Sequence, residues 1–135
     1  MFYKCVRAVV GFLVRILFGF KVTGRENIPE GGFLVCANHS SYLDPVFLAM
    51  ALDTRVPVRF MAKSNLFKIP LLGWFIKKLG AFPVNRNTAD LAAVKTSLRV
   101  LKEGQRLIIF PEGTRFNPGV SKGGAAMLAL RSGCT

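Results

Sequence analysis

The chain has 135 residues, a length that suits one domain with a modest hydrophobic core. It carries 19 Lys and Arg against 7 Asp and Glu, and this net charge of +12 predicts a negatively charged partner: nucleic acid, an anionic membrane surface or a phosphorylated substrate. Because 51% of the residues are hydrophobic, whereas nucleic-acid-binding domains of this size usually have a polar surface, the composition favours the membrane over nucleic acid.

Residues 1–20 (MFYKCVRAVVGFLVRILFGF) are predicted to form a basic amphipathic helix. Arg7 and Arg15 interrupt the apolar run, which falls short of the ~20 apolar residues of a membrane span, and no small-residue cleavage site follows. At about 100° per residue, one third of the helical wheel holds four basic residues, Lys4, Arg7, Arg15 and Lys21. This favours a helix lying in the headgroup region of an anionic bilayer. The alternatives are a helix packed on the domain and a tilted span with snorkelling arginines.

Two extended segments are expected next. Residues 20–23 form a candidate short strand, and the turn-rich stretch 24–32 connects it to the following element. Residues 32–37 (GFLVCA) are a short apolar run after glycines, which is typical of a buried strand.

The only histidine, His39, follows this strand and precedes Asp44 by five residues. Asp44-Pro45 ahead of an apolar run predicts a helix start, with Asp44 as N-cap and Pro45 at the first helical position. A turn between strand and helix can fold the carboxylate back toward the imidazole, which makes a general base with its orienting partner. The alternative is that Asp44 only caps the helix and His39 only satisfies a turn backbone.

The middle of the chain alternates between apolar and basic residues. A loop at residues 53–55 precedes a predicted strand at 56–61. In residues 63–78, large apolar side chains alternate with lysines around a helix-breaking Pro-Leu-Leu-Gly. Two interpretations stay open: two short core-packed helices, or a second membrane-surface contact that uses the only tryptophan, Trp74.

The last part predicts two more strands and two more helices. Residues 81–84 and 107–110 are the strands, and 89–103 and 122–131 are the helices. The first of these helices has a single apolar stripe, made of Leu91, Val94, Leu98 and Leu101. Strands that alternate with helices indicate an α/β fold, with a largely parallel sheet flanked by helices.

Polar residues follow three of the predicted strands, at the carboxyl ends where α/β sheets gather their functional groups. The first end carries His39 and Asp44, the second Asn85-Arg86, and the third residues 112–115 (EGTR). Guanidinium groups suit phosphate monoesters because they donate hydrogen bonds in a bidentate fork. Either arginine taken singly is also explained as a solvated surface charge.

Together these stretches resemble the glycerolipid acyltransferase family, in particular the bacterial 1-acylglycerol-3-phosphate acyltransferases. The His-x4-Asp motif is present as residues 38–44 (NHSSYLD), the second block as 80–86 (GAFPVNR) and the third as 110–115 (FPEGTR). Residues 60–74 also look like the interior of the family, so the resemblance covers nearly the whole chain.

The resemblance implies transfer of an acyl group from acyl-CoA or acyl carrier protein to the sn-2 hydroxyl of lysophosphatidic acid, giving phosphatidic acid in phospholipid biosynthesis. His39 and Asp44 are then the catalytic pair. The implied substrate-binding residues come from the second and third blocks: Asn85, Arg86, Glu112, Gly113, Thr114 and Arg115. The thioester co-substrate is already activated, so we expect no metal and no other cofactor. Other lysophospholipid acceptors, or a non-catalytic basic membrane-binding module, are the alternatives.

The resemblance also sets expectations for domains and location. We expect a membrane-interface helix over residues 1–20 and an acyltransferase domain over 21–135, bound at the cytoplasmic face of the cell membrane as a peripheral or monotopic protein. The three widely spaced cysteines, Cys5, Cys36 and Cys134, agree with a reducing cytosol and give no zinc site. The family continues into a further proline-containing strand, so we expect a C-terminally truncated piece with an open sheet edge.

Overall fold

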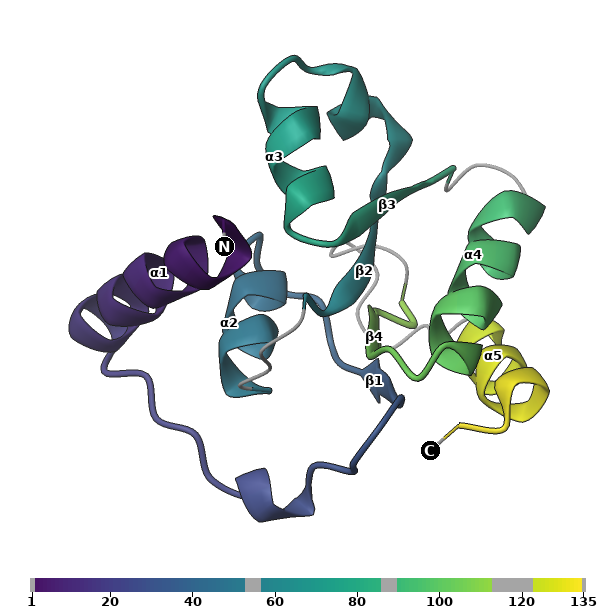
Figure 1. Cartoon of the computed structure of the whole chain (residues 1–135), viewed down its shortest axis with the longest axis horizontal. Coiled ribbons are helices and arrows are strands. Elements are labelled where there is room, and N and C mark those ends of the chain that lie inside the picture. The colour runs from purple at the N-terminus through teal and green to yellow at the C-terminus, as the bar shows by residue number, and fades with distance from the viewer. Residues whose placement is uncertain (1, 53–56, 86–89, 113–122, 135) are drawn as a thin grey trace.

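The computed structural model describes residues 2–52, 57–85, 90–112 and 123–134 (Figure 1). Helices and strands alternate through these residues. The helices are α1 (Phe2–Phe18), α2 (Asp44–Ala51), α3 (Leu72–Lys78), α4 (Leu91–Lys102) and α5 (Gly124–Ser132). The strands are β1 (Leu34–Cys36), β2 (Arg59–Lys63), β3 (Ala81–Val84) and β4 (Leu107–Ile109). Two short 3-10 helices, η1 (Arg25–Asn27) and η2 (Ser64–Lys68), complete the order.

Among the described residues, the four strands form one sheet in the order β1-β4-β2-β3, and every neighbouring pair is parallel. All residues of β4 are buried, as expected of an interior strand covered on both faces. Pro83 lies in the edge strand β3, where its missing N–H can be tolerated. The prediction of a largely parallel α/β sheet is confirmed.

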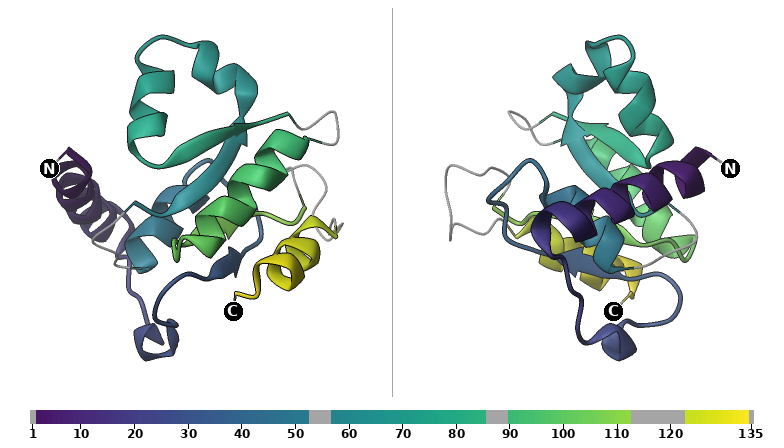
Figure 2. Two further views of the ribbon diagram at one scale, coloured as in Figure 1. Left: turned by 45° about the vertical axis from the view of Figure 1, so that its right-hand side comes forward. Right: turned by 90° about the vertical axis from the view of Figure 1, so that its left-hand side faces the viewer.

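Helices cover both faces of the sheet (Figures 1 and 2). Helices α4 and α5 pack on one face and α2 lies on the other, with α1 outside α2. The hydrophobic core lies between the sheet and the α4–α5 pair and consists of Phe82, Val100, Leu101, Leu107, Ile109 and Leu128. This arrangement leaves the carboxyl ends of all the described strands at one edge of the sheet, because they run in parallel.

Three of the four residues of the predicted stripe on α4 face the core: Leu101 is buried, and Val94 and Leu98 pack against it. The helix buries Ala93, Ser97, Val100 and Leu101, and Leu91 is 71% exposed. Leu91 and Ala93 are about 200° apart on the helical wheel, so the two cannot face the sheet together. The small side chains of Ala93 and Ser97 allow α4 to approach closely, and the Ser97 hydroxyl donates to the Ala93 carbonyl at 2.8 Å.

Two strand predictions were wrong, the first in the presence of a strand and the second in its bounds. Residues 20–23 form no strand, because Phe20 packs against α2 instead of a neighbouring strand: its ring stacks on that of Phe47 at 5.5 Å. The strand expected at 56–61 begins at Arg59, where pairing with β4 begins, and continues to Lys63 alongside β3. The predicted loop at 53–55 lies outside the described residues.

Helix α1 has one side on the protein and one side exposed. Val14 is its buried residue, and the ring of Phe18 meets Phe47 of α2 edge-on at 5.4 Å. The helix ends at Phe18, so Lys21 does not share its basic face as predicted. In the part of the chain that the structure describes, no helix combines the length and apolarity needed to cross a membrane.

The segment between β2 and β3 forms two short helices, η2 and α3, as one of the two open interpretations had it, but most of its large apolar side chains are not in a core. Leu71 is 83% exposed, and Trp74 is also exposed. Leu71 has φ 63° and ψ −53°, and the Leu72 N–H donates to the Pro70 carbonyl at 2.6 Å, which defines a strained γ-turn. The turn closes tightly because Gly73 lies against the backbone of Phe67.

This close approach predicts that Gly73→Ala destabilises the fold. An added Cβ would lie 2.6 Å from the Phe67 carbonyl oxygen, so the backbone must shift. We expect the free energy of unfolding, measured with urea, to fall by about 1–3 kcal/mol.

The matched control is Gly124→Ala in α5, where an added Cβ meets nothing within 4 Å. Because Gly124 is the exposed first residue of α5, that variant should change the free energy of unfolding by less than about 0.5 kcal/mol. Equal stability of Gly73→Ala and the unmodified chain would contradict the tight η2–α3 contact.

Candidate active site

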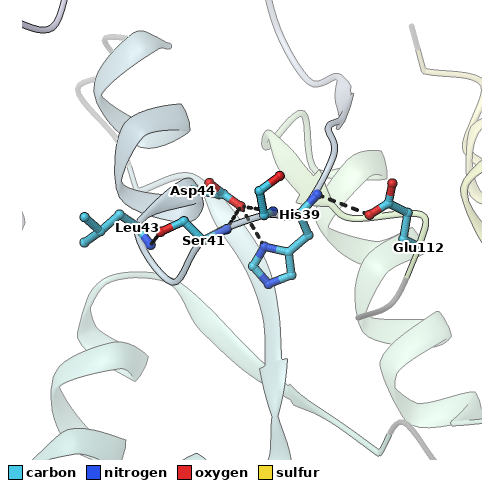
Figure 3. Close-up of polar contacts among 6 residues, drawn as sticks. His39, Ser41, Leu43, Asp44 and Glu112 are labelled. Atoms are coloured by element: carbon cyan, nitrogen blue, oxygen red, sulfur yellow. Dashed lines mark hydrogen bonds and ion pairs between the residues drawn. The ribbon is translucent and has the colours of Figure 1, made fainter. Parts of the chain in front are cut away.

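His39 and Asp44 meet in the turn between β1 and α2 (Figure 3). The His39 Nδ1 lies 2.9 Å from the Asp44 Oδ2, and the two side chains are 10% and 19% exposed. Five residues apart on a regular helix they would point in directions about 140° apart. The non-helical segment between them makes the contact possible, as the sequence predicted.

The Asp44 carboxylate faces the turn and does not cap α2. Its Oδ2 also accepts from the backbone N–H groups of Ser40 at 2.7 Å and Ser41 at 2.8 Å. The N-cap position belongs to Leu43, and no side chain caps the helix there. The prediction that Asp44 is the N-cap is therefore wrong, whereas Pro45 does lie in the first turn. The Asp44 carboxylate thus bonds to the backbone of the turn and to the imidazole.

These contacts shift the pKa of Asp44. Burial acts to raise it, but hydrogen bonds from the Ser41 backbone, the His39 side chain and the Ser40 backbone together hold the pKa below its ordinary value. Asp44 is therefore ionised near neutral pH, and an anionic acceptor beside Nδ1 favours the tautomer with the proton on that nitrogen. The lone pair of His39 then lies on Nε2, which points away from Asp44 (Figure 3).

Two residues of the third block position His39 from the β4 side. The ring of Phe110 stacks on the imidazole, with 4.1 Å between centroids and 20° between planes. The buried Glu112 accepts from the His39 backbone N–H at 3.4 Å through its Oε2. Because β1 and β4 are neighbours, these contacts join the first and third motifs at one edge of the sheet.

Asn85, from the second block, follows β3 at the same edge of the sheet. Strand β3 is three positions from β1, which corresponds to about 14 Å at the usual strand spacing. The Asn85 backbone N–H donates to the Asp90 Oδ2 at 2.7 Å, and the Asp90 Oδ1 caps α4 by accepting from Ala93 at 2.9 Å. The hydrogen bonds from Asn85, Ala93 and Ala92 lower the pKa of Asp90. Asp90 thus ties the end of β3 to the start of α4.

The structure places some of the predicted site residues and not others. It brings together His39, Asp44 and Glu112 and places Asn85 along the same edge. Arg86, Gly113, Thr114 and Arg115 lie outside the described residues. The sequence analysis did not assign roles to Phe110 or Asp90. An aspartate just before a periodic helix is a capping signal that could have identified Asp90, whereas the ring stacking of Phe110 had no local signal.

A mainly apolar cavity of about 310 Å³ opens beside this site, between the sheet and the α4–α5 pair. Phe110 lines it, so the ring that stacks on His39 also borders the cavity. Asn85 and Asp90 are its polar residues, and the side chains of Met61, Val94 and Leu128 contribute apolar surface. The site therefore combines a base with an apolar chamber. Within the described ranges, no group of three or more His, Cys, Asp or Glu could hold a metal ion.

Comparison with known proteins gives consistent matches. The family model described as "Acyltransferase" matches residues 19–135. The 1-acyl-sn-glycerol-3-phosphate acyltransferase of Bacillus subtilis is 35% identical over 94% of the chain, which covers 64% of that protein. The enzyme of the same name from Streptococcus pneumoniae is 36% identical over 96% of the chain, which covers 50% of it.

A solved structure agrees with these sequence matches. The crystal structure of the 1-acyl-sn-glycerophosphate (LPA) acyltransferase PlsC from Thermotoga maritima aligns with a TM-score of 0.71 at 30% identity. The alignment covers 98% of this chain and 56% of that one. The chain thus spans between half and two thirds of the length of these relatives.

The hydrogen bonds of Asp44 predict a pH-dependent contribution to stability. Because its pKa is lowered on folding, the stabilisation is fully present above the unfolded pKa of about 3.9 and is lost as the pH falls through the lower folded value. Asp44→Asn should reduce the free energy of unfolding by about 1 kcal/mol near neutral pH. The difference from the unmodified chain should vanish in acid, as measured by urea unfolding at a series of pH values. A difference that persists unchanged below the folded pKa would show that the charge of Asp44 does not matter. The exposed Glu30, changed to Gln, serves as the control.

Proposed function

Because this chain belongs to the acyltransferase family, we propose that its full-length protein transfers a fatty acyl group from a thioester to the sn-2 hydroxyl of 1-acylglycerol-3-phosphate, giving phosphatidic acid. The observation that carries this proposal is the His39–Asp44 contact of 2.9 Å at the carboxyl edge of the sheet. The names of the relatives support the acceptor. The donor, acyl-CoA or acyl carrier protein, follows from the need for an activated acyl group.

The catalytic step uses the free nitrogen of His39. Nε2 accepts the proton of the acceptor hydroxyl while the hydroxyl oxygen attacks the thioester carbonyl carbon. The carbon–sulfur bond then breaks, and the departing thiolate takes the proton from Nε2. Asp44 keeps the imidazole in the required tautomer and stabilises the imidazolium, and general-base catalysis of this kind contributes about 10²–10⁴-fold. The acceptor hydroxyl is itself the nucleophile, so the step involves no acyl-enzyme.

The other predicted residues complete the substrate site. We assign Arg86 and Arg115 to the glycerol phosphate because guanidinium groups form bidentate, charge-assisted bonds with phosphate. Asn85, Gly113 and Thr114 are assigned to the same substrate site, and Glu112 both borders it and fixes the His39 backbone. The apolar cavity beside Phe110 is suited to an acyl chain because it starts next to the base.

We further propose that the protein works on a membrane surface, through α1 and α3. The two helices meet where the Phe2 ring contacts Trp74 at 5.4 Å and Phe75 at 6.1 Å. Both helices expose large apolar side chains, among them Ile16 and Leu17 of α1 and Trp74 of α3. Residues 1–25 and 57–85 contain no Asp or Glu, so nothing in these stretches repels an anionic lipid surface.

The role of His39 predicts that His39→Ala in the full-length protein abolishes acyl transfer to lysophosphatidic acid. We expect a loss of at least 10²-fold, measured by mass spectrometry of phosphatidic acid. The fold should persist because the Glu112 carboxylate contacts the His39 backbone and not its ring. Added imidazole should restore part of the activity. Retention of more than about a tenth of the activity would exclude a general-base role.

The membrane proposal predicts different effects for two exposed leucines. Leu17 on α1 is 69% exposed, and Leu130 on α5, at the opposite side of the molecule in Figure 1, is 85% exposed. Leu17→Asn should weaken binding to phosphatidylglycerol vesicles severalfold, because an apolar contact is lost. Leu130→Asn should leave vesicle binding unchanged.

Salt and a third variant extend this test. Raised salt should weaken binding without eliminating it, because salt screens the charges but not the apolar contacts. Trp74→Ala tests whether α3 contributes. Equal effects of the two leucine substitutions would contradict membrane binding through α1.

A further inference from the structure

A second cavity, of about 780 Å³, lies between α1, the segment that follows it and the end of α2. We propose that it binds the phosphate headgroup of an anionic phospholipid that is not consumed by the enzyme. The volume is within the usual range for small-ligand sites, about 300–1,000 Å³. The inference goes beyond the proposed acyl transfer and uses none of the residues assigned to that reaction.

Four cationic side chains line this cavity, and none of the described residues that line it is acidic. Lys4, Arg7 and Arg15 come from one face of α1, and Arg25 comes from η1 across the cavity. The first Asp or Glu in the sequence is Glu26, so all the charges that precede it are positive. Two of the four, Lys4 and Arg15, are exposed to solvent, and each can form a charge-assisted bond with an anion.

The orientation of α1 indicates where this cavity lies relative to a bilayer. On the helical wheel, the exposed Val9 and Ile16 lie roughly opposite the basic residues that line the cavity. An amphipathic helix at an interface buries its apolar side among the acyl chains and keeps its polar side at headgroup depth. The cavity is therefore at the depth of lipid phosphates.

The walls of the cavity fit an amphiphile better than a free ion. Phe20 and Met50 provide apolar surface beside the cations. Arg25 is held at the cavity by a bond from its Nη2 to the Met50 carbonyl at 3.5 Å, at the end of α2. A guanidinium group placed in this way can donate to a phosphate oxygen, and the apolar walls can contact the glycerol and the first carbons of an acyl chain.

The cavity is separate from the catalytic pair. Asp44 begins α2, whereas Met50 lies near its other end, about 9 Å along the helix axis at 1.5 Å per residue. A lipid held at this end would anchor the protein while the site at the start of α2 remains open to substrate.

Calorimetric titration of the full chain with dihexanoyl phosphatidylglycerol, dihexanoyl phosphatidylcholine and inorganic phosphate tests this proposal. The test variant is Lys4→Gln with Arg15→Gln, two exposed cations of the cavity wall. The control is Lys95→Gln with Lys102→Gln in α4, which removes the same charge from two exposed residues outside the cavity and outside the proposed membrane-binding helices. We expect phosphatidylglycerol to bind the unmodified chain and the control alike, and to bind the test variant at least tenfold more weakly.

A second variant keeps the charge and changes the space. Ala8 lines the cavity and is exposed, so Ala8→Phe should narrow it and weaken phosphatidylglycerol binding while the fold, followed by circular dichroism, is retained.

Three outcomes would overturn the proposal. If the test variant and the charge-matched control variant bind phosphatidylglycerol equally weakly, the attraction is diffuse and the cavity is not a site. Binding of phosphatidylcholine as tight as that of phosphatidylglycerol would exclude an anion site. Inorganic phosphate binding as tightly as the lipid would assign the cavity to a free phosphate. Acyl transfer is not measured, so the outcome is independent of the proposed reaction.

Discussion

One oxygen of the Asp44 carboxylate accepts hydrogen bonds from the Ser40 and Ser41 backbone N–H groups and contacts His39 Nδ1. The remaining geometry of the site depends on this arrangement. The backbone donors fix the turn, and the fixed turn places the imidazole against the carboxylate. All three contacts favour the ionised form of Asp44, which is why its pKa is lowered despite partial burial. The same hydrogen bonds therefore hold the local fold and select the tautomer that leaves Nε2 free.

The parallel sheet brings the rest of the site to this turn. Neighbouring parallel strands end at the same edge, so β1 delivers His39 and β4 delivers Phe110 and Glu112 within contact distance. Strand β3 delivers Asn85 farther along the edge, and Asp90 holds that end in place. A long edge of this kind suits a reaction between two substrates, because the base and the proposed phosphate-binding residues come from different strands.

The amphipathic helix α1 gives the molecule two distinct surfaces on one element. Its apolar side is exposed and continues toward Trp74 of α3 through the Phe2 contact, whereas its basic side lines a cavity against α2. The basic residues are therefore held at fixed positions around a space, and they do not simply coat an outer face. The proposed interfacial binding and the proposed headgroup recognition therefore use opposite sides of the same helix.

The sequence by itself determined the α/β class, the parallel sheet and the pairing of His39 with Asp44. These follow from local signals: apolar runs, turn residues and a spacing that only a turn between strand and helix can close. It misplaced the strand at 20–23, the N-cap role of Asp44 and the burial of Leu91, because each depends on contacts that residue type and spacing do not specify. Phe20 packs on Phe47 of α2, and the Asp44 carboxylate accepts from the backbone of the turn. Leu91 is the first residue of α4 and is exposed, whereas Leu98, on the same side of the helix, packs against the core. The stacking of Phe110 on His39, the buried contact of Glu112 and the cation-lined cavity join residues far apart in the chain, so only the tertiary structure decided them.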